Sequence, residues 1–170
     1  MDKELQPIVQ VLEKEFGGTA EESFGEVQVF VSVEKLVSAS QKLRDDFGFA
    51  FLSTITAVDY YPETSPRFHV IYVFRSLSDN LQLSLRVPIA DESPNVPTLT
   101  GLYNNANWRE RELWDMFGIK VEDHPDLRRI LMPKDWDGHP LRKDYPLGYE
   151  EPQYTFNFEE IDLSKPKGKA

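Results

Sequence analysis

Cysteine is absent from the 170 residues, and its absence excludes several kinds of chemistry. Disulfide frameworks, thiolate catalysis, Cys-ligated zinc and Cys-held iron–sulfur clusters all need sulfur that this chain does not have. The chain also lacks the glycine patterns of nucleotide-binding loops and the GxSxG turn of serine hydrolases. The sequence therefore offers no recognisable attachment for a redox cofactor, although its three histidines could still bind a metal.

Long apolar runs and an excess of basic residues are also missing. The longest mainly apolar stretch, Phe47 to Val58, is well short of the ~20 residues that cross a bilayer. Lys and Arg number 19 against 29 Asp and Glu, which gives a formal net charge of −10. Nucleic-acid binding normally needs a basic excess on one face, so we expect no nucleic-acid partner.

Periodic apolar residues in the first 90 positions predict an αβαβββ core. Helical spacing stops at Gly17 and again at Gly48, as expected where helices end. Period-two alternation predicts the strands, and the last strand is expected to have one solvent-exposed face. In chain order, the elements are expected at residues 2–16, 27–33, 36–47, 49–60, 67–75 and 81–89. We therefore expect an α+β two-layer sandwich, with helices on one face of a mixed, mostly antiparallel sheet.

The second half of the chain is rich in proline, since nine of the twelve prolines lie in the last 83 residues. A connection rich in Pro, Asn and Thr leads to a helix over 107–117 that ends at Gly118. Asn107 is expected to cap this helix, and Glu110 at the third helical position would complete a capping box.

The helix and the segment after it contain more charge than helix stability requires. Residues 107–143 hold eight basic and eight acidic side chains. Arg111 and Asp115 are expected to form an exposed i,i+4 pair, which is worth only ~0.3–0.5 kcal/mol. Charged groups close to Trp114 and Trp136 are typical of protein interfaces. The composition predicts a partner-binding surface, with a polar loop folded back on its own sheet as the alternative.

Three ordered blocks in this region resemble a known family. They read ERELWDMFG at 110–118, HPDLRRIL at 124–131 and GHPLRKDYP at 138–146. Together they resemble the signature of the C subunit of the respiratory NADH:quinone oxidoreductase, complex I. Its counterparts are the mitochondrial 30-kDa subunit and the J subunit of the photosynthetic, ferredoxin-fed enzyme. The strong resemblance covers residues 107–147, and the predicted α+β core agrees with the family fold.

The resemblance implies a non-catalytic structural subunit in the peripheral arm of a proton-translocating complex. It implies no flavin, iron–sulfur cluster or quinone ligand in this chain, with FMN, iron–sulfur clusters and quinone in partner subunits. The implied partners are the large, D-type quinone-site subunit and neighbouring cluster-bearing subunits. Membrane association is expected only through the complex, at the cytoplasmic face of the cell membrane or on the matrix or stroma side of an organelle.

The periodic patterns and the signature region together divide the chain into three parts. We expect the core at residues 1–90, the charged helix and loop region at 91–147, and an extended C-terminal arm at 148–170. The residues expected to bind a partner are Arg109, Glu110, Arg111, Glu112, Asp115, His124, Arg128, Arg129, His139, Arg142 and Lys143. In the arm, aromatic residues alternate with polar ones around Phe156, so Pro146 to Leu163 is expected to extend over the large partner subunit. The alternative is that the arm closes an edge of its own sheet.

Two other hypotheses stay open at this point. His124 and His139, with Asp123, Asp126 and Asp137, could be ligands in a small metal-dependent hydrolase. Both histidines precede prolines in expected turns, and neither shows the i,i+4 spacing of a helical metal pair, which favours a structural role. The equivalent subunit of a related membrane-bound hydrogenase or formate-linked complex is also compatible with the resemblance.

Overall fold

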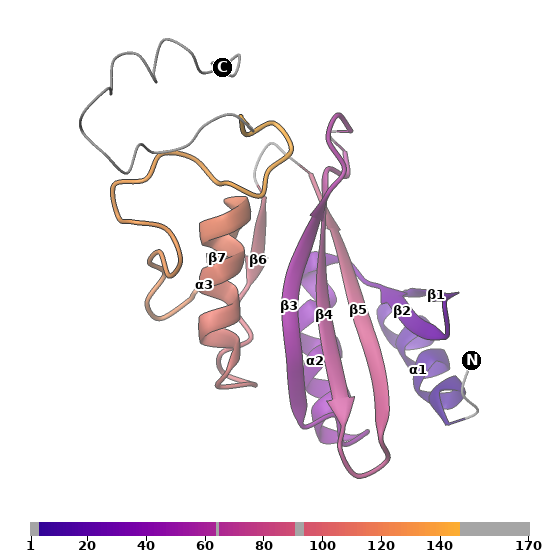
Figure 1. Cartoon of the computed structure of the whole chain (residues 1–170). Helices are drawn as coiled ribbons and strands as arrows, with labels where there is room; N and C mark the ends of the chain where they lie inside the picture. The colour runs from indigo at the N-terminus through magenta and orange to yellow at the C-terminus, as the bar shows by residue number, and fades with distance from the viewer. Residues whose placement is uncertain (1–3, 64, 91–93, 147–170) are drawn as a thin grey trace, which may run out of the picture.

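The computed structural model describes residues 4–63, 65–90 and 94–146, and Figure 1 shows their arrangement. In the first part of the chain, two strands follow one helix and three strands follow the next, and a further helix with two short strands comes after them. In chain order the elements are α1 (Leu5–Phe16), β1 (Thr19–Ser23), β2 (Glu26–Phe30), the 3₁₀ turn η1 (Val33–Lys35), α2 (Leu36–Asp45), β3 (Phe51–Asp59), β4 (Phe68–Ser76), β5 (Leu81–Ile89), β6 (Asn95–Pro97), α3 (Ala106–Phe117) and β7 (Lys120–Glu122).

The larger sheet has five strands in the order β1-β2-β5-β4-β3. Neighbouring strands are antiparallel except β2 and β5, which run parallel. Helices α1 and α2 lie behind this sheet in Figure 1. The strand residues on the helix side are buried, and in β4 Phe68, Val70, Tyr72 and Phe74 are all 0% exposed. The structure confirms the α+β class and the mixed, mostly antiparallel sheet with helices on one face.

The sequence pattern does not predict strand β1, so the expected αβαβββ order lacks one strand. Its five residues, TAEES, are exposed or half-buried and show no apolar alternation. The strand forms by pairing with β2 through a turn in which Phe24 and Gly25 have φ angles of 53° and 83°. Positive φ at both central positions matches the twist of paired strands. Pairing, and not the burial of its own side chains, therefore makes this segment a strand.

The outer face of β5 is found where alternation predicts it, but it is less exposed than expected. The alternate residues from Gln82 to Pro88 are at least half-buried, and Ser84 is only 4% exposed. Strand β5 lies between β2 and β4, so side chains of both neighbours cover this face from the sides. The solvent exposure of a strand's outer face depends on the position of the strand within the sheet. Alternation along the sequence does not encode that position.

Helix α3 and the short parallel pair β6–β7 extend the same hydrophobic core. Val96, Leu99, Leu113 and Ile119 are at most 1% exposed and belong to one cluster with the buried residues of the sheet. In Figure 1, α3 lies beside β3, the edge strand of the large sheet. The helix that carries the first signature block therefore rests directly on the sheet core.

Two further observations concern membrane-spanning helices and the C-terminal residues. Within the described ranges, no helix has the length and apolar character needed to cross a bilayer. The predicted C-terminal arm at 148–170 lies outside the described residues.

Candidate functional site

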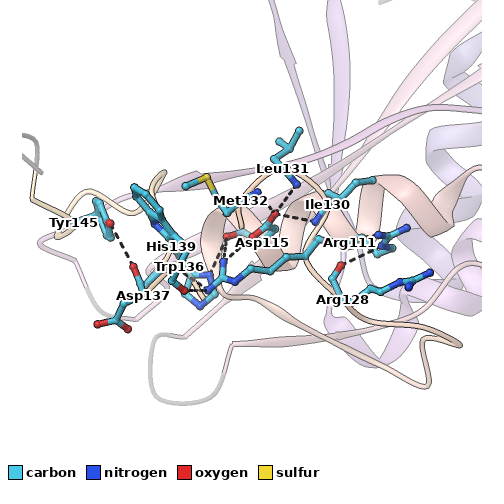
Figure 2. Close-up of polar contacts among 12 residues, drawn as sticks. Arg111, Asp115, Arg128, Ile130, Leu131, Met132, Trp136, Asp137, His139 and Tyr145 are labelled. Atoms are coloured by element: carbon cyan, nitrogen blue, oxygen red, sulfur yellow. Dashed lines mark hydrogen bonds and ion pairs between the residues drawn. The ribbon is translucent and has the colours of Figure 1, made fainter. Parts of the chain in front are cut away.

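Asp115 organises the segment that follows α3 (Figure 2). Its side chain is 0% exposed. Oδ2 accepts hydrogen bonds from the backbone N–H groups of Ile130, Leu131 and Met132 at 3.0, 2.8 and 2.9 Å. Oδ1 accepts a hydrogen bond of 2.6 Å from Nη1 of Arg129. Burial alone raises the pKa of Asp115, but these four donors outweigh it and hold the pKa below its usual range.

The predicted exposed pair between Arg111 and Asp115 is wrong. Arg111 instead donates to the backbone carbonyls of Arg128 at 3.1 Å and Arg129 at 3.2 Å. Helical spacing places Arg111 and Asp115 as neighbours, but it does not reveal that a loop covers them. The returning loop supplies better partners to both side chains, because its N–H groups need acceptors and its carbonyls need donors.

Arg129 and His139 attach the next turn of the segment to the same helix. Nη2 of Arg129 donates to the carbonyls of Trp136 and Gly138 at 2.9 and 3.1 Å. Nδ1 of His139 lies 3.0 Å from the carbonyl oxygen of Asp115. A Cβ atom on Gly118 would lie 2.5 Å from the His139 ring, and Gly118 has a φ of 72°. The glycine that ends α3 is thus required both by its backbone conformation and by the close approach of His139.

A buried arginine ties the end of the segment to the sheet. Arg67 is 2% exposed and donates to both carboxylate oxygens of Asp59, each at 2.9 Å. Its guanidinium also donates to Asp144, with Nη2 at 2.6 Å from Oδ1. The backbone N–H of Lys143 donates to Asp59 at 2.8 Å. The third signature block is therefore anchored to the junction of β3 and β4.

The second charged group buried on α3 is Glu110. It does not form the predicted capping box, because α3 begins at Ala106 and the Glu110 carboxylate reaches a different part of the chain. Its oxygens accept hydrogen bonds of 2.6 Å from the hydroxyl of Thr98 and from the backbone N–H of Leu99. Burial raises the pKa of Glu110 to about 7, although these two bonds act in the opposite direction.

His124 lies next to Glu110. Its Nε2 is 3.2 Å from the carbonyl oxygen of Asn107 and 3.8 Å from Oε2 of Glu110. Its Nδ1 accepts a hydrogen bond of 3.0 Å from the backbone N–H of Asp126. Both ring nitrogens are therefore engaged in holding the turn after β7 against the start of α3.

The geometry does not bring the proposed metal ligands together. His124 bonds to the carbonyl of Asn107 and His139 to that of Asp115, and these carbonyls lie ~12 Å apart along the helix axis. In the part of the chain that the structure describes, no group of three or more His, Asp or Glu side chains is arranged to hold a metal ion. The hydrolase hypothesis gains no support from these residues.

The exposed side of this region contains a groove of about 340 Å³. Its lining residues are Phe51, Ser53, Asn105, Trp108, Arg109, Glu112, Ile130 and Leu131. The apolar members are unusually open to solvent, with Trp108 and Leu131 each 62% exposed. Arg109 and Glu112 form an ion pair of 3.4 Å on the same helix face. The groove thus combines exposed apolar side chains with charge of both signs, a mixture found at protein interfaces.

The eleven residues predicted to bind a partner fall into two groups. Seven are buried or half-buried and have their polar groups engaged within the chain: Glu110, Arg111, Asp115, His124, Arg129, His139 and Arg142. Four others have solvent-exposed side chains: Arg109, Glu112 and Arg128, which form surface ion pairs, and Lys143. The first group holds the loop at 128–132 against α3. The second group lies at the surface, as do the groove residues. Binding of a partner by these residues stays a prediction.

Sequence reasoning missed two parts of this site. The apolar residues of the groove were visible in the sequence, but their exposure was not, since hydrophobic residues are expected inside. The Arg67–Asp59 pair has a local signal, because the two residues flank a predicted hairpin. The third member, Asp144, is 77 residues away from Arg67, and nothing in a single sequence relates them.

Comparisons with known proteins place this chain among subunits of a respiratory enzyme. Residues 29–151 match the family described as respiratory-chain NADH dehydrogenase, 30 Kd subunit. A relative from Roseiflexus sp. (strain RS-1), named as the C subunit of NADH-quinone oxidoreductase, is 47% identical over 147 residues, covering 85% of this chain and 84% of the relative. A relative of the same name from Geobacter sulfurreducens is 44% identical over 123 residues, covering 72% of this chain and 76% of the relative.

Two solved structures are similar to this chain. A trypsin-resistant fragment of Nqo5, residues 1–134, has a TM-score of 0.65 and 34% identity, covering 73% of this chain and 99% of the fragment. A chain in the membrane-bound sulfane sulfur reductase, an archaeal respiratory membrane complex, has a TM-score of 0.74 and 20% identity, covering 86% of this chain and 87% of that chain. At this lower identity the second structure shows a shared fold alone.

Proposed function

This chain belongs to the 30-kDa subunit family of the respiratory-chain NADH dehydrogenase, and from that membership we propose that it is a non-catalytic structural subunit of the peripheral arm. It is a subunit of the NADH-quinone oxidoreductase complex, as the shared name of its relatives states. In the proposal, it docks the large, D-type quinone-site subunit and contacts neighbouring cluster-bearing subunits. Those partners carry FMN, iron–sulfur clusters and quinone, and the chain reaches the cytoplasmic face of the membrane only through them.

The groove between α3 and the loop at 128–132 is the observation that supports docking at this site. The loop is held by three backbone hydrogen bonds to the buried Asp115, so the side chains of Ile130 and Leu131 have a defined place at the surface. Ile130 and Leu131 are 37% and 62% exposed. An exposed apolar surface does not stabilise an isolated subunit in water. When a partner covers that surface, its removal from water contributes favourable free energy to binding.

Replacing Leu131 with Asp tests this docking site. A charge in a desolvated interface weakens binding by about tenfold or more, so the variant should co-purify poorly with the large subunit. Leu77→Asp is a matched control, because Leu77 is 73% exposed and lies in the turn between β4 and β5, away from the groove. Both variants should unfold at the same urea concentration as the parent chain. Undiminished co-purification of Leu131→Asp would contradict docking at this groove.

A second measurement tests the absence of redox chemistry in the chain. Purified alone, the subunit should show no visible absorbance, bind neither NADH nor flavin and reduce no quinone. A bound chromophore in a stoichiometric amount would overturn the structural role. Identification of the companion chains in the native assembly would separate an NADH- or ferredoxin-fed enzyme from a related hydrogenase or formate-linked complex.

A further inference from the structure

The outer face of the large sheet carries an arginine whose described polar contacts are all to neutral groups. This is the face of β2, β3, β4 and β5 opposite to α1 and α2, and Figure 1 shows no described helix in front of it. Arg86 on β5 donates through Nε to Nδ1 of His69 at 2.8 Å and through Nη1 to Gln28 at 2.9 Å. Its Nη2 donates to the hydroxyl of Tyr60. Within the described residues, no carboxylate forms an ion pair with Arg86.

The guanidinium is held in place by these contacts. Three of its five N–H groups are used, and the other two have no described acceptor. The Cζ atom of Arg86 lies 5.4 Å from the centroid of the Phe30 ring and 5.8 Å from that of the Tyr60 ring. The Glu63 carboxylate affects the ionisation of the neighbouring His69 but makes no described ion pair with the arginine. Arg86 is therefore a positioned cation with donor capacity to spare, in a chain whose net charge is −10.

Apolar groups surround this cation on the same face. The strand registers place Phe30, Arg86, Ile71 and Thr56 in one row across β2, β5, β4 and β3. A hollow of about 480 Å³ lies at the β2 end of the row. It is lined by the apolar residues Phe30, Val31, Val33 and Pro88 together with Gly17, Thr19, Ser32 and Glu34. A fixed cation beside apolar side chains and a hollow is suited to a segment that pairs a carboxylate with an apolar residue.

We propose that this outer face, centred on Arg86, is a second docking surface, and that it binds an acidic segment of a neighbouring subunit with a carboxylate on Arg86 and an apolar side chain in the adjacent hollow. The proposal rests on membership of the multisubunit assembly, but it does not depend on the groove beside α3. Charge complementarity is its physical basis, because a carboxylate would supply the acceptors that the two remaining N–H groups lack.

The absence of native cysteine allows a direct test in the assembled complex. Thr56→Cys places a single thiol in the Arg86 row at an exposed position, about 10 Å from β5. Its rate of maleimide labelling in the free subunit and in the complex reports whether the face is covered. Gln41→Cys, exposed on α2 in the opposite layer, is the matched control. We expect labelling at position 56 to be lost in the complex and labelling at position 41 to continue.

Substitution of the arginine then tests the chemistry of the contact. Arg86→Gln in the Thr56→Cys background should restore labelling in the complex to about a tenth or more of the free-subunit rate. Arg75→Gln is the control, since Arg75 is an exposed arginine of the same face that bonds Gln82 at 3.0 Å. Equal labelling at position 56 in the free subunit and in the complex would overturn the proposal.

Two further outcomes separate this proposal from its alternatives. If position 56 is protected in the free subunit and becomes reactive in a variant that ends at Pro146, the chain's own C-terminal segment is the occupant and the proposal fails. A Trp108→Cys probe reports on the groove beside α3 in the same experiment. Protection at position 56 without protection at position 108 would support the second surface while contradicting docking at the groove, so the two proposals can fail independently.

Discussion

Arg129 and Asp115 form an ion pair in which Nη1 and Oδ1 lie 2.6 Å apart, and this pair joins the second signature block to the first. Asp115 is fully buried, and the side chain of Arg129 is 13% exposed. The three residues that follow Arg129 supply three further N–H donors to the same carboxylate. The signature residues thus serve the internal structure of the site as much as its surface.

Replacing Asp115 with Asn should destabilise the chain and loosen the loop at 128–132. An amide keeps the shape of the side chain but leaves Arg129 without its counter-ion, so we expect a loss of ~3 kcal/mol in the free energy of unfolding. Urea unfolding followed by circular dichroism would measure this loss. Glu112→Gln is the control, because its ion pair with Arg109 is surface-exposed and should contribute less than ~0.5 kcal/mol. Equal stability of the two variants would contradict the assigned role of Asp115.

The two adjacent arginines of the second block should respond differently to charge reversal. Arg128 is 66% exposed and pairs with Asp126, so Arg128→Glu should fold normally and weaken partner binding only. Arg129→Glu should place a second carboxylate beside Asp115 and lose more than ~3 kcal/mol of stability. The structure therefore predicts that charge reversal is tolerated by the fold at Arg128 but not at Arg129. Co-purification combined with urea unfolding of each single variant would separate the two effects.

Glu110 should make the stability of the chain depend on pH. Its pKa is raised from 4.5 to about 7, so between these values the folded chain binds a proton that the unfolded chain has released. Stability therefore falls as the pH rises from ~4.5 to ~7, by at most ~3 kcal/mol, and Glu110 adds no further change above that range. Glu110→Gln should remove this dependence. Unfolding free energies measured between pH 5 and 8 would test it, and identical pH profiles for the two chains would contradict the prediction.

Asp59 should make the stability of the chain fall as the pH is lowered, the opposite of the effect of Glu110. Burial alone raises its pKa, but hydrogen bonds from Arg67, Lys143 and Tyr61 lower it from 3.8 to about 2. Its contribution to stability is present above pH ~4 and is lost as the pH falls toward ~2, a change of about 2 kcal/mol. Asp59→Asn should be less stable than the parent chain at pH 7 and should lose less stability on acidification. Acid titration of the two chains, followed by tryptophan fluorescence, would check this.

Local patterns in the sequence determined which segments form helices and strands with one buried side. They also determined where several helices end. Alternation predicted β3, β4 and β5, because a half-buried strand must be apolar at every second residue. The end of α3 at Gly118 was also predicted, since a residue with a φ of 72° favours glycine. The three signature blocks identified the family by themselves. Strand β1 could not be predicted, because it is held by pairing and has no buried face.

Only the tertiary structure decided which charged residues are internal and which face a partner. Helical spacing put Asp115 on an exposed face, yet a returning loop covers it completely. The contact of Arg67 with Asp144 joins residues 77 positions apart, and the contact of Asp59 with Lys143 joins residues 84 apart. Periodicity records the side of an element that is buried against its neighbours. It holds no information on which distant segment supplies the neighbour, because that depends on how the whole chain packs.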